Sequence, residues 1–499
     1  MNNRKEKAML DGRKEEDRRI YERSARMIFL LALRDIAPEA KVRFEHSLGR
    51  GIYLTITGAS VTPDFVRRIE QRMREITAQD LQITRQTIEK EKALSYFSSI
   101  GQEDTVRLLR YRPFDTLNVW SCGGYTEFFY GNMANSTGEI QQYALRMYYP
   151  GLVLLLPGTN LSEKPAPLAD RPCLMRAYQR AYLNSKICGC RNAADLNDII
   201  RQGGMRELIR LDETLQQHEI AGIAGQIAAR GARIVFVAGP SSSGKTTFAN
   251  RLSVELKACG KRPVAVSLDN YYLDRDKVPL NKEGKPDLEC LESIDVPLFG
   301  EQLIRLLDGE EVELPQYSFK TKKRESKGVK MSIGPEDILV VEGIHGLNPS
   351  LSDCIPGGYK FLVYVSALTP LSLDNHNRIR ATDARFLRRL VRDKRTRGSG
   401  VEDTMSMWDN VRAGEEKYIY PYQEMADAMF NTSLIYELPI LKKYAYDLLK
   451  AVKPDSVYYT RARRVVKFLN YFVDSYDEAE IPPTSILREF IGGCSFYDE

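Results

Sequence analysis

The feature that most constrains this chain is a strand–loop–helix pattern over residues 234–260. The run Ile234–Ala238 is apolar and rich in β-branched residues, which predicts a buried strand. Residues 239–246 then fit G-x-x-x-x-G-K-[ST], the phosphate-binding P-loop. Large apolar residues recur at every fourth position until Gly260, which predicts a helix beginning at Lys245. The alternative is a chance Gly/Ser turn. The predicted strand before the motif and the predicted helix after it favour a P-loop, because a P-loop requires both.

The P-loop predicts a site for ATP and Mg²⁺. Its glycines let successive backbone N–H groups point at phosphate oxygens, and the helix N-terminus adds partial positive charge. Lys245 is expected to reach the β- and γ-phosphates, and the hydroxyl of Thr246 is expected to bind Mg²⁺. The residues expected to hold the nucleotide are Gly239, Ser241, Ser242, Ser243, Gly244, Lys245, Thr246 and Thr247.

Length and composition predict a multidomain globular chain. A chain of 499 residues is too long to fold around one hydrophobic core. Its composition, 43% hydrophobic and 28% charged residues, is ordinary for a soluble protein. Neither a membrane-spanning run nor the apolar core of a signal peptide is visible. The eight cysteines lack paired spacing, which favours reduced thiols. A cytoplasmic protein without a membrane partner is expected.

The positive charge is concentrated in one segment. The net charge is +5, but residues 378–397 alone carry +7 and the remainder −2. A general nucleic-acid binder would be basic more broadly, so we expect no stable nucleic-acid complex. The segment is better interpreted as a phosphate clamp, although a solvated basic helix face is the competing interpretation.

Residues 231–445 alternate strands with helical segments. The runs 263–268, 338–341 and 361–365 are apolar and β-branched, as parallel strands buried on both faces are. This pattern predicts an α/β fold with a doubly wound parallel sheet. In such folds ligands bind beyond the carboxyl ends of the strands.

Two carboxylates follow strands of that sheet. Phosphoryl transfer requires a group that accepts the proton of the acceptor hydroxyl and groups that hold Mg²⁺. Asp269 is expected to be the base and Glu342 the metal-binding acid. An Asx turn at Asp269 and a helix-capping role for Glu342 are the structural alternatives.

Residues 383–398 are expected to form a basic helix. Arg385, Arg389 and Arg392 recur at i, i+4 and i+7, so they share one face. This spacing is typical of a lid whose arginines grip phosphates and whose closure excludes water.

The whole chain is expected to divide into five parts. Strands are predicted at Gly51–Thr57 and at 147–156, and Thr62 with Pro63 should cap a helix. The parts are a charged tail (1–20), an α+β domain (21–160), a helical connector (161–230), the P-loop domain (231–445) and a C-terminal helical extension (446–499).

The motifs GPSSSGKTT, LDNYY, ELPQYSF, VVEGIHGL and RRLVRDKRTRG resemble the uridine kinase and phosphoribulokinase family in order and spacing. The resemblance implies that Asp269, Lys245 and Arg392 are catalytic and that Arg397 binds phosphates. It implies that Thr246 and Glu342 hold Mg²⁺. The side chains that it places near the nucleoside are Tyr272, Asp287, Glu289, Tyr317 and Arg389.

The resemblance implies ATP-dependent phosphorylation of a nucleoside 5′-hydroxyl, with a pyrimidine nucleoside as first expectation. The positions that face the pyrimidine in the family read here as Lys322, Ser399 and Met407, so the identity of the nucleobase is left open. The alternatives are a kinase of another small alcohol or sugar phosphate, and a tRNA-associated regulator without turnover. A homo-oligomer is also left open.

The α+β part resembles the editing domain of threonyl- and alanyl-tRNA synthetases, on GIYLTITGASVTPDF and CGGYTEFFYGNMANSTGEIQQYALRMYYPG. That domain holds two His, a Cys and another His at its pocket. The matching positions here read Arg23, Met27, Phe129 and Met133, which are poor Zn²⁺ ligands. We therefore expect no zinc and no deacylation, although this domain could contact tRNA.

Overall fold

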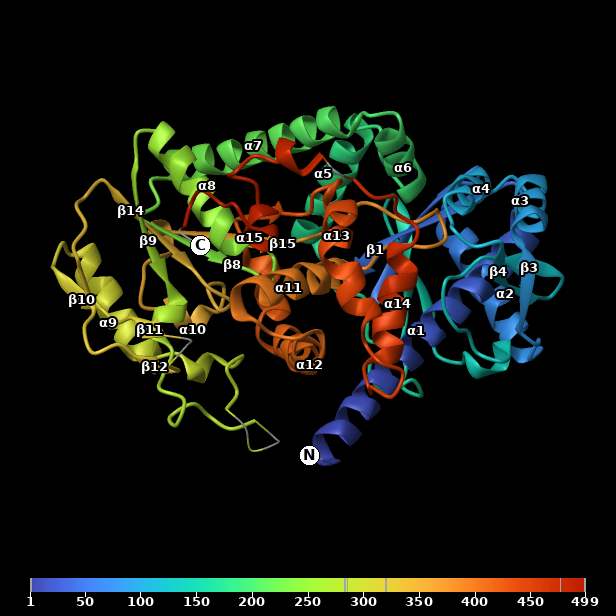
Figure 1. Cartoon of the computed structure of the whole chain (residues 1–499), viewed down its shortest axis with the longest axis horizontal. Coiled ribbons are helices and arrows are strands. Elements are labelled where there is room, and N and C mark those ends of the chain that lie inside the picture. The colour runs from blue at the N-terminus through green and yellow to red at the C-terminus, as the bar shows by residue number, and fades with distance from the viewer. Residues whose placement is uncertain (1, 282–283, 285, 319–320, 476, 498–499) are drawn as a thin grey trace.

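The computed structural model describes residues 2–281, 284, 286–318, 321–475 and 477–497, with side chains from residue 14 onward. The P-loop half lies on the left of Figure 1, the N-terminal domain on the right, and helix α14 (Tyr459–Leu469) between them. No helix in the described part of the chain is long and apolar enough to span a membrane.

The P-loop half is built on a five-stranded parallel sheet, which confirms the predicted α/β class. The strand order is β16-β15-β8-β14-β9, and every neighbouring pair is parallel. All five residues of β8 are buried, as its apolar sequence predicts. The bounds are β8 Ile234–Ala238, β9 Arg262–Ser267, β14 Asp337–Glu342, β15 Lys360–Ser366 and β16 Ala428–Asn431.

Helices cover this sheet on both faces. The P-loop helix α8 begins at Lys245, as predicted, and Arg251 on it forms a buried ion pair with Glu213 of α7. Besides α7 Met205–Arg230 of the connector, the helices around the sheet are α8 Lys245–Ala258, α9 Val296–Leu307, α10 Pro349–Ser352, α11 Ala381–Arg397, α12 Val401–Tyr418, α13 Glu437–Lys450 and α15 Arg488–Ile491. Short strand pairs flank the sheet: β10 Val312–Leu314 with β13 Val329–Met331, and β11 Tyr317–Ser318 with β12 Lys323–Arg324.

The N-terminal domain is α+β. One antiparallel sheet has the order β1-β2-β7-β6 and another the order β3-β4-β5. Strand β2 and the helix capped by Thr62 form as predicted, and the helix buries Phe65, Ile69 and Met73. The elements are β1 Lys41–Leu48, β2 Gly51–Thr57, α2 Pro63–Ala78, β3 Thr84–Glu89, α3 Lys90–Ser99, α4 Glu103–Arg110, β4 Thr116–Cys122, β5 Tyr125–Glu127, β6 Ala144–Tyr148 and β7 Gly151–Leu155.

The single strand predicted at 147–156 is wrong. The structure has a hairpin there, with β6 and β7 paired and Tyr149 and Pro150 in the turn. A proline cannot donate a ladder hydrogen bond, so Pro150 ends one strand before Gly151 begins the next. A Cβ at Gly151 would lie 2.2 Å from the carbonyl oxygen of Leu54, which explains the glycine.

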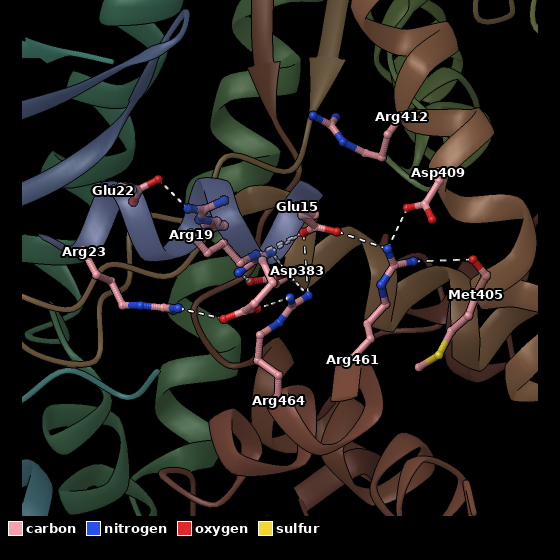
Figure 2. A network of polar contacts seen from close by, with 12 residues as sticks. Glu15, Arg19, Glu22, Arg23, Asp383, Met405, Asp409, Arg412, Arg461 and Arg464 are labelled. Atoms are coloured by element: carbon pink, nitrogen blue, oxygen red, sulfur yellow. Dashed lines mark hydrogen bonds and ion pairs between the residues drawn. The ribbon is translucent and has the colours of Figure 1, made fainter. Parts of the chain in front are cut away.

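The charged N-terminal segment belongs to one long helix, α1 (Asn2–Ile36). Arg19 is almost fully buried and forms an ion pair with Asp383 of α11, and Glu15 binds Arg461 of α14 (Figure 2). The expected boundary at residue 20 therefore falls inside a packed helix. The boundary expected at 445 likewise falls inside α13.

The connector is helical, with α5 Pro172–Ile187, α6 Ala193–Arg201 and α7. The amide of Asn197 donates to the carbonyl oxygen of Tyr471, and the side chain of Gln216 donates to the backbone around Ser433. These contacts hold the connector against the P-loop half and the C-terminal helices.

Candidate active site

The P-loop lies tightly against β15. A Cβ at Gly239 would lie 1.9 Å from a backbone oxygen of that strand, so only glycine fits. Ser242 and Gly244 have φ of +59° and +81°, which turns the loop back on itself. The ammonium of Lys245 donates to the carbonyl oxygen of Pro240 at 3.3 Å. This contact folds the lysine over the loop, above the backbone that would hold phosphates.

The two threonines after Lys245 differ in exposure. Thr246 is exposed, whereas Thr247 is fully buried. The hydroxyl of Thr247 donates to Oε2 of Glu489 at 2.8 Å and lies 3.1 Å from the phenol oxygen of Tyr497. The backbone nitrogen of Thr247 lies 3.4 Å from the same Glu489 oxygen. A carboxylate from the C-terminal segment therefore occupies the helix N-terminus that was expected to face phosphate.

Asp269 and Glu342 lie at the ends of neighbouring parallel strands. Asp269 lies two residues after β9, in the short 3₁₀ helix Leu268–Tyr271, and Glu342 is the last residue of β14. The hydroxyl of Ser267 donates to Glu342 Oε1 at 2.9 Å. Burial raises the pKa of both carboxyl groups, and the charge of Asp269 helps to raise that of Glu342 to about 7. The positive charge of Lys245 opposes both shifts.

A third carboxyl group with a raised pKa belongs to the half-buried Glu289. Burial, followed by the charge of Glu415, raises its pKa to about 7, while Arg389 and Lys245 act in the opposite direction. Its backbone N–H donates to Asp287 Oδ1 at 3.1 Å. The two acids that the family resemblance implies beside the nucleoside thus lie together, and Glu289 lies close enough to the P-loop lysine to feel its charge.

The two tyrosines expected near the nucleoside are also neighbours. The ring centroids of Tyr272 and Tyr317 lie 5.6 Å apart, and the hydroxyl of Tyr272 donates to the carbonyl oxygen of Leu288. Burial and then the charge of Asp269 raise the pKa of Tyr272 well above its ordinary value. The pair forms an aromatic wall beside the carboxyl group of Asp269.

Two arginines of α11 hold the P-loop through Ser241. Arg385 donates to its carbonyl oxygen at 2.9 Å, and Arg389 donates to its hydroxyl at 2.8 Å. Arg385 also forms a fully buried ion pair with Glu415 of α12. Because α11 supports the loop from one side, the conformation of the loop depends on this helix.

Helix α11 is held to its neighbours by buried contacts at both ends and in the middle. Arg388, which the sequence did not single out, is fully buried and paired with the buried Glu437 of α13. The first turn of α11 is tied to α1, and its last turn to the backbone of Phe490 through Arg395. Ion pairs that bury two charges are costly to break. In this conformation α11 forms one wall of the site, and its closure as a lid stays a prediction.

The last arginines of α11 act on the candidate base through their charge. Arg392 and Arg397 share Asp393, with N···O distances of 2.9 and 3.7 Å. Both also oppose the raised pKa of Asp269 by their positive charge. The structure therefore brings Lys245, Asp269, Glu342, Glu289, Arg389, Arg392 and Arg397 to one edge of the sheet.

Two of the three positions expected to face the nucleobase, Lys322 and Met407, are exposed. Lys322 is exposed in the β11–β12 turn at φ +61°, and Met407 is exposed on α12. The backbone N–H of Ser399 donates to the carbonyl oxygen of Asp393, the residue that pairs with Arg392 and Arg397.

The site fits Mg²⁺ by the chemistry of its donors. Thr246, Asp269 and Glu342 offer oxygen atoms, which this ion prefers, and a divalent cation would offset the burial that raises the pKa of Glu342. Among the described residues, no group of three or more His, Cys, Asp and Glu side chains could hold a metal ion. A Mg²⁺ ion here would therefore depend on phosphate and water oxygens as well, as is usual for this ion.

Sequence reasoning missed two acids of the site, Glu415 and Glu489. Glu415 is fully buried and binds both Arg385 and Arg412, and Glu489 lies 242 positions from the threonine that it binds. Local patterns carry no signal for such partners, because the contacts join elements that only the folded chain brings together.

Comparisons with known proteins match the P-loop half of the chain to one family. The model of the phosphoribulokinase/uridine kinase family matches residues 234–435. A uridine kinase of Lactobacillus helveticus is 30% identical over 195 residues, which are 39% of this chain and 83% of that protein. A uridine kinase of Staphylococcus haemolyticus is 29% identical over 196 residues, 39% and 84% of the two chains. The solved structure of a possible uridine kinase from Bacillus stearothermophilus aligns with TM-score 0.30 and 19% identity, over 42% of this chain and 97% of that one.

Proposed function

Because this chain belongs to the phosphoribulokinase/uridine kinase family, we propose that it transfers the terminal phosphoryl group of ATP to the 5′-hydroxyl of a nucleoside. Kinase activity follows from the family. The nucleoside acceptor, with uridine or cytidine as first candidate, is the proposed part. The products would be ADP and the nucleoside monophosphate.

The observation that carries the proposal is the position of Asp269. Its carboxyl group is half-buried at a strand end, within the electrostatic reach of Lys245, Arg392 and Arg397. A raised pKa brings a carboxylate nearer to the pH at which it can accept a proton efficiently. The same surroundings offer cations for the phosphoryl group that the hydroxyl would attack.

The residues of the chain would then act as follows. Lys245 and the P-loop N–H groups bind phosphate oxygens, and Arg392 and Arg397 bind the transferring group. Asp269 accepts the proton of the attacking hydroxyl at its carboxylate oxygen. Thr246 and Glu342 would hold Mg²⁺, which supplies positive charge to the phosphates when bound.

On the acceptor side, Glu289 and Asp287 are the candidates for binding ribose hydroxyls. Tyr272 and Tyr317 would stack on the nucleoside, and Arg389 lies between the acids and the P-loop. This arrangement suits an acceptor with a planar ring and neighbouring hydroxyl groups.

ADP release from ATP, Mg²⁺ and a panel of nucleosides tests the proposal. Asp269→Asn should lower kcat by roughly 10²–10⁴-fold and nearly spare ATP binding. Asp276→Asn is the matched control, because it is the same change at an exposed position seven residues away. Loss of ATP binding in Asp269→Asn would show that Asp269 is mainly a metal ligand.

The same panel separates the alternatives. Turnover of a sugar phosphate or another small alcohol, without turnover of any nucleoside, would show that the chain is a kinase of a different acceptor. No turnover of any alcohol, together with tight binding of tRNA, would favour a regulator. The assembled set of Lys245, Asp269 and Glu342 supports a reaction, because a nucleotide switch needs no base for an acceptor.

We further propose that residues 21–160 keep the scaffold of a synthetase editing domain without its metal chemistry. Met27, Phe129 and Met133 lie in one apolar core, and Arg23 donates to the carbonyl oxygen of Asn132 at 2.7 Å. These contacts fill positions that would otherwise hold ligands. Metal analysis of the full chain and an assay of mischarged tRNA hydrolysis test this, and stoichiometric zinc would contradict it. A cytoplasmic location also stays a proposal.

A further inference from the structure

A cavity of about 530 Å³ lies between the N-terminal domain and the C-terminal helices. Its wall comes from β3, β4, the segments 112–114 and 128–132, and the helices α13 and α14 with the residues just after α14. It shares no lining residue with the P-loop, the strand ends or α11. The cavity is therefore separate from the candidate active site.

One wall of the cavity is the sheet formed by β3 and β4. Arg85 and Trp120 are paired in register, so they lie on the same face, and strand alternation adds Asn118 and Thr116. Trp120 is only 7% exposed, and among the described residues its indole Nε1 has no hydrogen-bond partner. A buried donor without an acceptor is costly. An acceptor atom supplied by a ligand at this wall would remove that cost.

The opposite wall is one face of α14. Arg463, Val466, Lys467 and Asn470 recur at i, i+3, i+4 and i+7, which places them in one stripe. Lys450 at the end of α13 lies beside them on the cavity wall. Three basic side chains from two helices therefore face the strands.

The lining carries positive charge without acidic partners. Its five basic residues are Arg85, Arg112, Lys450, Arg463 and Lys467, and no Asp or Glu lines it. In the described part of the chain, none of the five forms an ion pair with an acid. By contrast, Arg461 and Arg464, on the other side of α14, are paired with Glu15 (Figure 2). The surplus of positive charge is thus a property of this face, and it favours an anion.

The lining is also aromatic. Seven of its nineteen residues are Phe, Tyr or Trp, among them Phe114, Tyr446 and Tyr471. Aromatic faces bind planar rings by stacking, and arginine side chains stack on such rings as well. The combination of cations with aromatic side chains suits a ligand that has both a planar ring and a phosphate.

We propose that this cavity binds a free nucleotide, with the base against the aromatic side chains and the phosphate against Arg463, Lys467 and Lys450. The volume is that of a site for one small molecule. Outside residues 378–397 the chain carries a net charge of −2, so a broad basic surface for RNA is lacking. The site is independent of the acceptor proposed above.

Trp120 provides a local probe. The chain has two tryptophans, and Trp408→Phe leaves Trp120 as the only one. In this variant, UMP, UTP and AMP are titrated while tryptophan fluorescence is recorded. At least one nucleotide should change the emission saturably. Uridine and inorganic phosphate should bind at least tenfold more weakly, because uridine lacks the phosphate and inorganic phosphate lacks the base.

Charge reversal on the cavity wall provides the matched comparison. Arg463→Glu with Lys467→Glu, or Lys467→Glu alone, should weaken nucleotide binding roughly tenfold or more, because charge-assisted contacts are lost. Lys453→Glu should leave it unchanged, since that exposed residue lies outside the cavity lining. Unchanged thermal unfolding verifies that the variants fold.

Three outcomes would overturn the proposal. The first is that none of the three nucleotides changes the fluorescence at millimolar concentration. The second is an equal affinity in the charge-reversal and Lys453→Glu variants, and the third is a response only to a single-stranded RNA oligonucleotide. The signal must also persist in Lys245→Ala. Its loss there would assign the response to the P-loop and would likewise reject a second site.

Discussion

Arg19 of α1 and Asp383 of α11 lie 364 positions apart and form an ion pair, with Nη2 and Oδ1 2.8 Å from each other. Arg19 is 3% exposed at its side chain, and Arg464 lies 3.9 Å from the same carboxylate. The pair fastens the N-terminal helix to the helix that supports the P-loop (Figure 2).

The first prediction concerns this contact. Arg19→Met should destabilise the chain by about 3 kcal/mol, because it leaves a buried carboxylate with fewer partners. Arg18→Met is the control, since its side chain is exposed on the same helix. Denaturant unfolding of both variants measures the difference. Equal stabilities would show that α1 does not depend on Asp383.

A second prediction concerns pH. His376 Nδ1 lies 2.8 Å from Glu127 Oε2, across the boundary between the P-loop half and the N-terminal domain. Burial alone would lower the pKa of His376, but the charge and hydrogen bond of Glu127 outweigh it and raise that pKa to about 9. The folded chain therefore holds a proton that the unfolded chain releases near pH 6.5.

The stabilisation by this proton is fully present below pH 6.5 and is lost as pH rises through about 9. The whole effect should be on the order of 3 kcal/mol. Thermal unfolding of the native chain and of Glu127→Gln between these pH values checks it. A native chain whose pH dependence matches that of Glu127→Gln would contradict the prediction.

A third prediction concerns Lys245. Lys245→Ala should abolish phosphoryl transfer and leave unfolding unchanged, because the side chain contacts the P-loop backbone and no apolar core. Lys257→Ala on the same helix is exposed and should keep full activity. Normal turnover of a folded Lys245→Ala variant would reject the assignment of the P-loop.

A fourth prediction concerns Glu489. Its carboxylate lies at the N-terminus of α8, so its negative charge opposes the nucleotide phosphates there. Glu489→Gln keeps an acceptor for Thr247 and removes the charge, so KM for ATP should fall several-fold with kcat little changed. Steady-state kinetics measures this. A rise in KM would instead mean that the carboxylate arranges the loop for binding.

Local sequence determined the elements that carry the site in the P-loop half. Strand β8, the first turn of α8 and the positions of Asp269 and Glu342 at strand ends all follow from apolar runs and a short motif. These features depend on neighbours within a few residues, so a single sequence carries them. The signal for the turn at Pro150 was also local. The sequence analysis missed it because apolar residues on both sides of Pro150 resemble one continuous strand.

Only the tertiary structure decided what surrounds those elements. The basic spacing of α11 predicted a shared arginine face, but Glu415 and Glu437 decide that Arg385 and Arg388 are buried structural partners. Likewise, no sequence pattern near Thr247 predicts its hydrogen bond to Glu489. No pattern near Trp120 predicts that it shares a cavity with α14. The physical reason is common to all of these. The energy of a buried charge or cavity depends on which distant elements share the space, and the sequence encodes that only through the whole fold.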